Sequence, residues 1–333
     1  MSFLEAFLLE IVMQEFNARQ YVAIDLANHI GMDKLPWDDR IQWVKDNIDS
    51  LDQHIPDDPK TKFLYIKAMN ALHCNEPTGF IMALDATNSG AQIMSVLGKC
   101  GVSASTCNVV NTGKREDLYT NIMDQVTCSG INRQDVKEAI IPMMYGSKAA
   151  PKALFGEGTD RLKAFNSAVE KTVPILGEMM ALMKECWDSS AKFHTFTMPD
   201  GHVVRLPTMM LHQERIRVFD TSFTYQWKDI APDTNSTSLL ANVIHAVDGY
   251  VAREMVRRTN IAGFQLAHIH DSYWCSPCYM NQVRQFYKDI LIELAQSNLL
   301  ENIMGQLIGE KVELNYTHPD LWKEMKDAEY MLS

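Results

Sequence analysis

Apolar positions along the chain recur mostly at helical spacing. The clearest stripe opens the sequence, and its members are Phe3, Leu4, Phe7, Leu8, Ile11 and Val12. Such a stripe is typical of the buried face of an amphipathic helix, which packs on the core of its own chain or on another polypeptide. Helical patterns also dominate up to about Cys186 and return from about Met280. The pattern therefore predicts a mainly helical protein.

Three short stretches have the pattern of strands instead. The run TGFIMAL, from Thr78 to Leu84, is apolar and predicts a buried strand that ends at Asp85. The turn sequence Pro199-Asp200-Gly201 separates HTFTM from HVVRL and predicts a hairpin. The segment from Gly263 to Trp274 alternates apolar and polar residues, which predicts a second strand with His270 and Asp271 near its turn. We expect an α+β fold, mainly helical, with a small antiparallel sheet.

The charge of the chain limits how it can meet nucleic acid. A net charge of -11 excludes binding through bulk positive charge. Contacts would need local patches, and the candidates are Arg215 with Arg217, and Arg253 with Arg257 and Arg258. Each of these groups taken alone is more typical of a solvated face.

Targeting signals and cysteine usage favour a cytoplasmic protein. Glu5 and Glu10 interrupt the apolar opening and no basic region precedes it, so we expect no signal peptide and no membrane span. Seven cysteines lie at irregular spacings, which is not typical of a disulfide framework. Only Cys275-Ser-Pro-Cys278 has the spacing of metal ligands, and without a second pair it favours two ordinary thiols over a zinc site.

Two carboxylates stand at the ends of the predicted strands. Asp85 and Asp271 are far apart in sequence, so only tertiary folding can bring them together. A pair of acidic side chains that holds two hard cations is what two-metal phosphoryl transfer requires. An aspartate after a strand is, taken alone, more often a turn or helix-cap residue.

A third element makes this pair informative. In NRQDVKEAIIPMMYGSK, Asn132 is placed to cap a helix that begins near Arg133, and Lys137 and Tyr145 follow at spacings of four and eight. These spacings place the two cations and the ring on one broad helical face, where they could grip a nucleoside triphosphate. Pro142 should bend this helix before Tyr145. The alternative is an ordinary amphipathic helix with solvated cations.

The three elements together resemble the single-subunit RNA polymerases of phages and mitochondria. DATNSGAQ at Asp85 resembles the first catalytic motif of that family, the helix from Arg133 to Gly146 the second, and HDS from His270 to Ser272 the third. Four further blocks, in the same order as in the family, are ANHIGMDKLPWDDR from Ala27, DLY ending at Tyr119, TMPDG from Thr197 and HAVDG from His245.

The resemblance implies a right-hand polymerase fold and two Mg²⁺ ions. It implies a palm over residues 1–101, fingers over 102–245 and a second palm part with a C-terminal foot over 246–333. The expected metal ligands are Asp85, Asp271 and the Ala86 carbonyl, with His270 orienting the neighbouring acid. The expected nucleotide-binding residues are Lys34, Tyr119, Arg133, Lys137, Tyr145, Gly146 and His245. Ile93, where the family commonly has His, departs from the pattern.

RNA rather than DNA synthesis is implied by what the motifs lack. Related DNA polymerases usually carry a Glu five positions after the first catalytic Asp and another after the HD pair, and this chain has Gly90 and Ser272 there. It also has Ile141 where those enzymes place an aromatic ring. A DNA polymerase fragment and a catalytically silent nucleic-acid-binding subunit remain the alternatives.

The family's Asp-x-x-Gly-Arg motif, thumb and N-terminal promoter region have no counterpart in the sequence. The resemblance is therefore greatest to the larger, catalytic subunit of a split phage RNA polymerase, a heterodimer in the bacterial cytoplasm. The expected partners are a smaller subunit with the thumb and arginine motif, the DNA template, nascent RNA and NTPs. A shortened promoter-reading hairpin, from about Arg205 to Asp233, predicts dependence on single-stranded template or on a single-stranded-DNA-binding activator.

Overall fold

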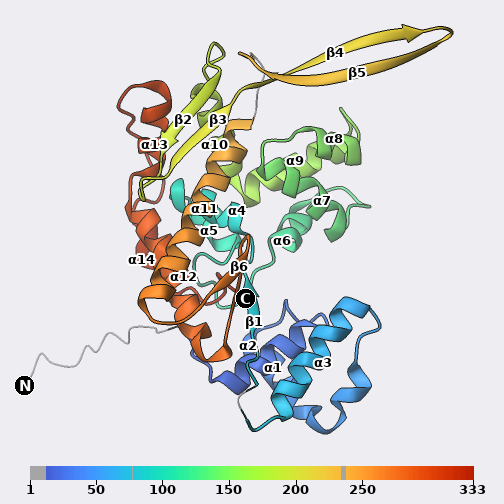
Figure 1. Ribbon diagram of the computed structural model, residues 1–333, viewed down its shortest axis with the longest axis vertical. Coiled ribbons are helices and arrows are strands. Elements are labelled where there is room, and N and C mark those ends of the chain that lie inside the picture. The colour runs from blue at the N-terminus through green and yellow to red at the C-terminus, as the bar shows by residue number, and fades with distance from the viewer. Residues whose placement is uncertain (1–12, 77, 234–237) are drawn as a thin grey trace, which may run out of the picture.

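The computed structural model describes residues 13–76, 78–233 and 238–333 (Figure 1). The apolar stripe at residues 3–12 lies outside the described residues. The fold is mixed and mainly helical, with three small antiparallel sheets. In the part of the chain that is described, no helix has both the length and the apolar composition needed to cross a bilayer.

The first helices form a separate group at the bottom of Figure 1. Helix α1 packs on both α2 and α3. Local sequence sets their starts, because Asn17 and Gln20 form a capping box at α1 and Asp58 caps α3 with Pro59 in the first turn. The elements are α1 (Ala18–Asn28), α2 (Trp37–Asp46), the 3-10 helix η1 (Ile48–His54) and α3 (Pro59–His73).

The central sheet has the strand order β1-β7-β6 and carries the two predicted aspartates. Strand β1 (Met82–Asp85) pairs with β7 (Ser272–Cys275), which pairs with β6 (Ala267–Ile269). The predicted strand from Thr78 is shorter than expected, because Gly79 has φ +67° and only residues from Met82 onward face a partner. The predicted second strand is a hairpin, because His270 takes the left-handed conformation (φ +53°) and turns the chain.

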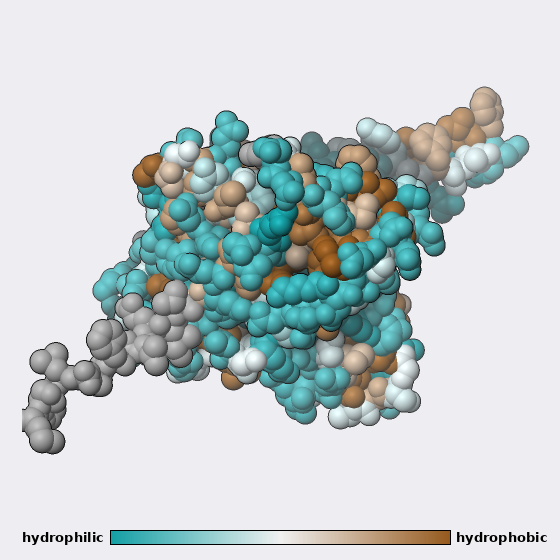
Figure 2. Space-filling view, turned by 90° about the horizontal axis from the view of Figure 1, so that it is seen from below, coloured by the Kyte–Doolittle hydropathy of each residue, from teal (hydrophilic) through white to brown (hydrophobic). Residues whose placement is uncertain are grey.

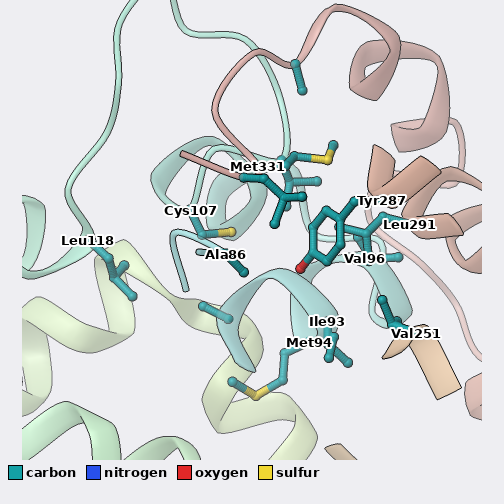
Figure 3. Close-up of a cluster of buried hydrophobic side chains, with 14 of the residues drawn as sticks. Ala86, Ile93, Met94, Val96, Cys107, Leu118, Val251, Tyr287, Leu291 and Met331 are labelled. Carbon is teal, nitrogen blue, oxygen red and sulfur yellow. The ribbon is translucent and has the colours of Figure 1, made fainter. Parts of the chain in front are cut away.

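A buried core lies behind β1. Helix α4 (Ser89–Leu97) packs on four other helices, namely α5 (Gly101–Thr106), α10 (Pro174–Glu185), α11 (Ser238–Ile261) and α12 (Met280–Gln296). The fully buried Gln92 side chain accepts from the Tyr287 hydroxyl at 2.8 Å and donates to Thr87, to the Cys107 carbonyl and to the Met331 carbonyl. Figure 3 shows Tyr287 among apolar side chains from several segments. Burial of polar groups is tolerated here because each finds a partner.

The segment around Met331 closes this core against the central sheet. Ala86 and Leu332 form an isolated antiparallel bridge, Thr87 N–H donates to the Met331 carbonyl, and Ser333 N–H donates to the Asp85 carbonyl. The preceding elements are α11 (Ser238–Ile261), the 3-10 helix η2 (Pro277–Tyr279), α12 (Met280–Gln296), α13 (Leu299–Ile308), α14 (Leu321–Glu324) and the 3-10 helix η3 (Met325–Asp327). The prediction of a helix from Met280 is confirmed.

A second helical group lies across from α1–α3, on the other side of the central sheet (Figure 1). Its members pack in the pairs α6 with α7, α6 with α9, and α7 with α8. The predicted start of α7 is confirmed, since Asn132 and Asp135 form a capping box before Arg133. The elements are α5 (Gly101–Thr106), α6 (Leu118–Gln125), α7 (Arg133–Met144), α8 (Ala149–Phe155), α9 (Asp160–Thr172) and α10 (Pro174–Glu185).

Two hairpins complete the fold. The one predicted around Pro199 is confirmed, with β2 (Phe193–Thr197) paired to β3 (Val203–Pro207) and β2 in contact with α13. The other joins β4 (Met209–Val218) to β5 (Thr221–Ile230) and projects away from the body (Figure 1). Apolar side chains are visible on this projecting arm in Figure 2.

Candidate active site

The two predicted aspartates lie on neighbouring strands of the central sheet. Asp85 is the last residue of β1 and faces Ser272 in the register. Asp271 belongs to the turn before β7, and its carbonyl accepts from the Ala86 N–H at 3.0 Å. The fold therefore brings the first and third motifs to one end of the sheet, as the sequence predicted.

Several carboxylates lie close together at this end of the sheet, so negative charge is concentrated there. Burial raises the pKa of Asp271, and the negative charge of Asp85 adds to the effect. A third carboxylate, Asp248 on α11, lies close enough for the Asp271 charge to matter. Its own burial and that charge raise the pKa of Asp248 to about 6. A cation would relieve this repulsion.

These donors fit a hard divalent cation. Carboxylate and carbonyl oxygens are the ligands that Mg²⁺ prefers. Within the described residues no cluster of three or more His, Cys, Asp or Glu side chains could hold a metal ion by itself. The pair Asp85 and Asp271 would thus need oxygens from the main chain, the substrate or water, which is common for magnesium bound beside phosphates.

A cavity of about 550 Å³ opens beside Asp85. Among its lining residues are cations from four separate segments of the chain, namely Lys34, Lys60, Lys67, Arg115 and Lys137. Lys34 follows α1 and pairs with Asp33. Lys137 comes from α7 and is exposed. A negatively charged group in this cavity would meet several cations as well as Asp85.

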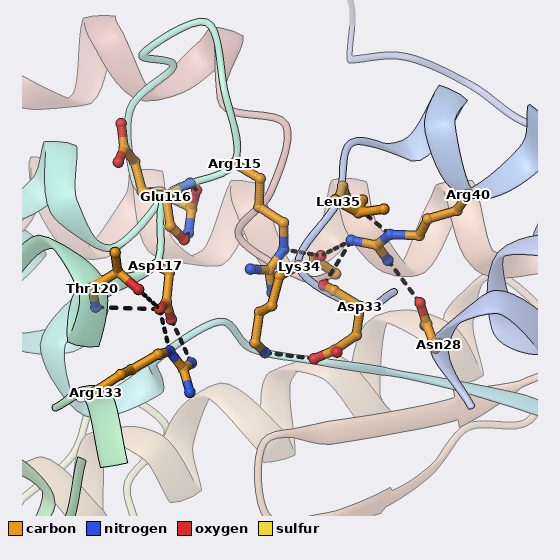
Figure 4. A network of polar contacts seen from close by, with 12 residues as sticks. Asn28, Asp33, Lys34, Leu35, Arg40, Arg115, Glu116, Asp117, Thr120 and Arg133 are labelled. Atoms are coloured by element: carbon orange, nitrogen blue, oxygen red, sulfur yellow. Dashed lines mark hydrogen bonds and ion pairs between the residues drawn. The ribbon is translucent and has the colours of Figure 1, made fainter. Parts of the chain in front are cut away.

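Arg133 is engaged elsewhere in this structure (Figure 4). Its Nε and Nη2 donate to the two carboxylate oxygens of Asp117, at 2.6 and 2.8 Å. Burial alone would raise the pKa of Asp117, but hydrogen bonds from Arg133 and Thr120 outweigh it and lower the pKa to about 2. The guanidinium carbon lies 5.2 Å from the centre of the Tyr119 ring, and the Lys137 ammonium lies 5.9 Å from the same ring.

Tyr145 and His245 meet at the other side of the site. Tyr145 ends α7, and the centre of its ring lies 4.7 Å from that of His245 on α11. Gly146 follows with φ +84°, a conformation that glycine adopts freely. A Cβ placed on Gly90 would lie 3.7 Å from the Tyr145 hydroxyl oxygen, so this glycine leaves open the space beside the ring.

Three charged residues of the site were not predicted from the sequence. Asp248 stands in the HAVDG block that carries the resemblance, so its position was available as a signal. Asp117 begins the DLY block in the same way. Arg115 stands two residues before that block and carried no signal. The ring of His270 is exposed and lies near both Asp248 and Asp271, where positive charge on the ring would oppose the rise in their pKa values.

A small sheet that carries paired carboxylates, opposite a capped helix with cations, is the arrangement expected of enzymes that transfer nucleotides. The family comparison agrees with this class. The model of the DNA-dependent RNA polymerase family matches residues 15–153 and 196–329, and the chain belongs to that family.

Curated relatives are plant organellar enzymes. DNA-directed RNA polymerase 1B, mitochondrial, of Nicotiana tabacum is 21% identical over 350 residues, covering 86% of this chain and 35% of that protein. DNA-directed RNA polymerase 1, mitochondrial, of Arabidopsis thaliana is 22% identical over 86% of this chain and 36% of its own length. DNA-directed RNA polymerase 3B, chloroplastic, of Nicotiana tabacum is 22% identical over 82% and 34%. The chain thus spans about a third of the length of these relatives.

Proposed function

We propose that this chain carries the catalytic centre of a DNA-directed RNA polymerase and transfers nucleotides from NTPs to a growing RNA on a DNA template. The observation that carries the proposal is the meeting of Asp85 and Asp271 at one end of the central sheet, beside a cavity that Lys34 and Lys137 also line. Membership in the family supports the same reaction.

The proposed site binds metal through oxygen atoms. Asp85, Asp271 and the Ala86 carbonyl would hold two Mg²⁺ ions. Bound magnesium would make the attacking 3'-hydroxyl more acidic and stabilise the charge on the leaving pyrophosphate. The raised pKa of Asp271 supports this assignment, because a buried pair of carboxylates is more stable with a cation between them.

The remaining residues position the nucleotide. Lys34 and Lys137 bind the triphosphate, and Arg133 joins them when it leaves Asp117. Tyr119 lines the substrate side of the cavity. Tyr145 and His245 contact the ribose, with Gly146 allowing the chain to turn behind them. The open space at Gly90 would admit the 2'-hydroxyl group of a ribonucleotide.

The proposed domain division follows the two helical groups. Residues 1–101 and 246–333 form the palm around the central sheet, and residues 102–245 form the fingers with α7 and the β4–β5 hairpin. The grouping of α6 to α9 on one side of the sheet supports this division.

The finer proposal concerns partners. A second, smaller polypeptide with the thumb and the Asp-x-x-Gly-Arg motif would complete the enzyme, and a single-stranded-DNA-binding activator would deliver the template. The resemblance to a split phage enzyme supports it. Purification of the chain from its native source should yield a smaller protein with that motif, and processive RNA synthesis by the chain alone would contradict it.

The test of the function is primed RNA extension on a DNA template. The chain, purified with its native partners, should extend the primer with ribonucleotides and use deoxynucleotides poorly. The variant Asp271→Asn should lose this extension activity. Its matched control is Asp160→Asn on α9, because the Asp160 side chain is 94% exposed and lies outside the cavity. Equal extension by the Asp271 variant would refute the proposal, and preference for deoxynucleotides would favour a DNA polymerase.

A further inference from the structure

Two arginines from distant segments converge on one hydroxyl group beside the catalytic cavity. Arg40 Nη2 and Arg115 Nε both donate to the Ser333 Oγ, at 3.1 and 2.8 Å. The Ser333 N–H in turn donates to the Asp85 carbonyl at 2.9 Å. Figure 4 shows Arg40, Arg115 and Lys34 within one network of polar contacts. Both guanidinium groups are therefore held within a short distance of the strand that bears the first aspartate.

Each nitrogen of the Arg40 guanidinium group donates at least one hydrogen bond. Its Nε donates to the Leu35 carbonyl, Nη1 to Asn28, and Nη2 to the Asp33 carbonyl as well as to Ser333. The side chain is fully buried and lies over the Trp37 ring. Arg40 therefore has a structural role, since it joins the loop after α1 to Ser333.

Arg115 has the opposite character. Among the described residues its side chain makes a single hydrogen bond, the one to Ser333, and no ion pair. It is half-buried and lines the same cavity as Asp85, Lys34 and Lys137. A guanidinium has five N–H donors, so those on Nη1 and Nη2 have no protein acceptor. Neither nitrogen is among the buried polar atoms that lack a partner, so both are open to solvent and free to bind a ligand in the cavity.

The surrounding charge indicates an anionic ligand. Burial, together with the positive charge of Arg115, lowers the pKa of Arg40 to about 10. Of the carboxylates whose charge acts on Arg115, Asp33 is paired with Lys34 and Asp117 with Arg133. Positive charge therefore exceeds negative charge on this wall of the cavity, and the planar fork of a guanidinium suits phosphoryl oxygens.

The geometry points to Arg115 as a further binding residue for the polyphosphate tail of the incoming nucleoside triphosphate, acting from the segment just before α6. This inference rests on the proposed function, because that function supplies the triphosphate. Arg115 would grip the tail together with Lys34, while Lys137 approaches from α7.

The experiment measures binding of inorganic tripolyphosphate by calorimetry at fixed Mg²⁺, so it needs no polymerisation. Arg115→Gln should weaken the binding about 10- to 100-fold, the loss expected for charge-assisted hydrogen bonds to phosphate. Arg115→Lys should lose less, because it keeps the charge. The matched control is Arg161→Gln on α9, outside the cavity, which should bind as the parent chain does.

Thermal melting distinguishes binding from a structural role. Arg115→Gln should melt no lower than the parent chain, because it relieves repulsion with Arg40, whereas Arg40→Gln should melt far lower. Unchanged tripolyphosphate affinity in Arg115→Gln, or a melting loss as large as that of Arg40→Gln, would overturn the inference. So would weaker binding of a single-stranded RNA oligonucleotide with no change for tripolyphosphate.

Failure of the inference and failure of the proposed function have different signatures. If Arg115→Gln extends RNA normally with an unchanged KM for NTPs, the inference about Arg115 is wrong and the proposed function still stands. If the chain binds tripolyphosphate through Arg115 but forms no RNA with its partners, the proposed function is wrong and the binding site still stands.

Discussion

The central sheet and the β4–β5 hairpin are both antiparallel ladders, but β1 and β7 of the sheet alternate buried residues with more exposed ones, whereas the hairpin strands have no buried residue. The edge strand β6 is exposed, as the hairpin is. Strands β1, β6 and β7 have three or four residues each, and Tyr273 in β7 is completely buried. Strands β4 and β5 have ten residues each and expose side chains on both faces, with Tyr225 53% exposed. The hairpin depends on cross-strand contacts, such as the stacking of His212 on Trp227.

The difference shows that the two regions contribute to different properties of the protein. In the central sheet, packing of the core fixes the positions of charged groups at the strand ends. In the hairpin little apolar area is removed from water, so changes there should affect contacts with other molecules more than stability. Four predictions test this contrast, from the largest expected effect to the smallest.

The largest effect is expected at the end of the central sheet. Asp271→Ala should reduce RNA extension by at least about 1,000-fold, because the proposed metal pair would lose a ligand. The folded chain should be no less stable, since repulsion with Asp85 is removed. Extension and thermal melting measure the two quantities, and deletion of residues 211–228 should leave primed extension far less affected. Comparable losses from both changes would break the contrast.

The second prediction compares two tyrosines. Tyr273→Ala should lower the free energy of unfolding by about 3 to 5 kcal/mol, because it leaves a large cavity in the core. Tyr225→Ala in the hairpin should cost less than about 1 kcal/mol, mainly through its stacking on Trp227. Urea unfolding of both variants tests this. Similar costs would mean that the hairpin is covered in the folded protein.

The third prediction concerns pH and the junction of α6 with α7. The pKa of Asp117 is lowered to about 2, from about 3.9 in the unfolded chain. Its contribution to stability, about 1 to 2 kcal/mol after allowance for solvent screening, is therefore complete above about pH 4 and lost as the pH falls toward 2. Asp117→Asn should flatten this part of the stability profile.

Asp320→Asn is the control for this pH dependence. Asp320 pairs with Lys323 at an exposed site, with the carboxylate side chain 65% exposed. Such pairs contribute little, so the acid profile of this variant should follow that of the parent chain. An Asp117 variant with the same profile as the parent would contradict the assigned ion pair with Arg133.

The smallest effect should be a gain in stability. The Tyr273 hydroxyl is buried and has no hydrogen-bond partner among the described residues. Tyr273→Phe removes the cost of this unsatisfied group and should raise the free energy of unfolding by about 1 kcal/mol. Urea unfolding measures it, and a clear loss would indicate that the hydroxyl binds water or a ligand.

Local signals in the sequence predicted the elements that depend on neighbouring residues. Asn132 marked the start of α7, and Pro199-Asp200-Gly201 marked the turn between β2 and β3. These succeed because a cap or turn is determined by a few adjacent residues. The strand at Asp85 was predicted too long, because its length depends on which residues find a partner in β7.

The candidate site was predictable only where motifs carried it. Asp85 and Asp271 were placed together by the order of the blocks, and the fold agrees. The pairing of Asp117 with Arg133, and of Arg115 with Ser333, depends on contacts between distant segments. No periodicity or spacing encodes such contacts, so the sequence could not reveal them.

The bridge between Ala86 and Leu332 also has a kinetic consequence. Closing so large a loop has a high entropic cost, and contacts of this kind slow folding. During synthesis, the helices around α1 to α3 can condense from local contacts while the strand bearing Asp85 still lacks its neighbour. The contacts of Asp85, Ala86 and Thr87 with residues 331–333 therefore cannot form until that later segment has been synthesised.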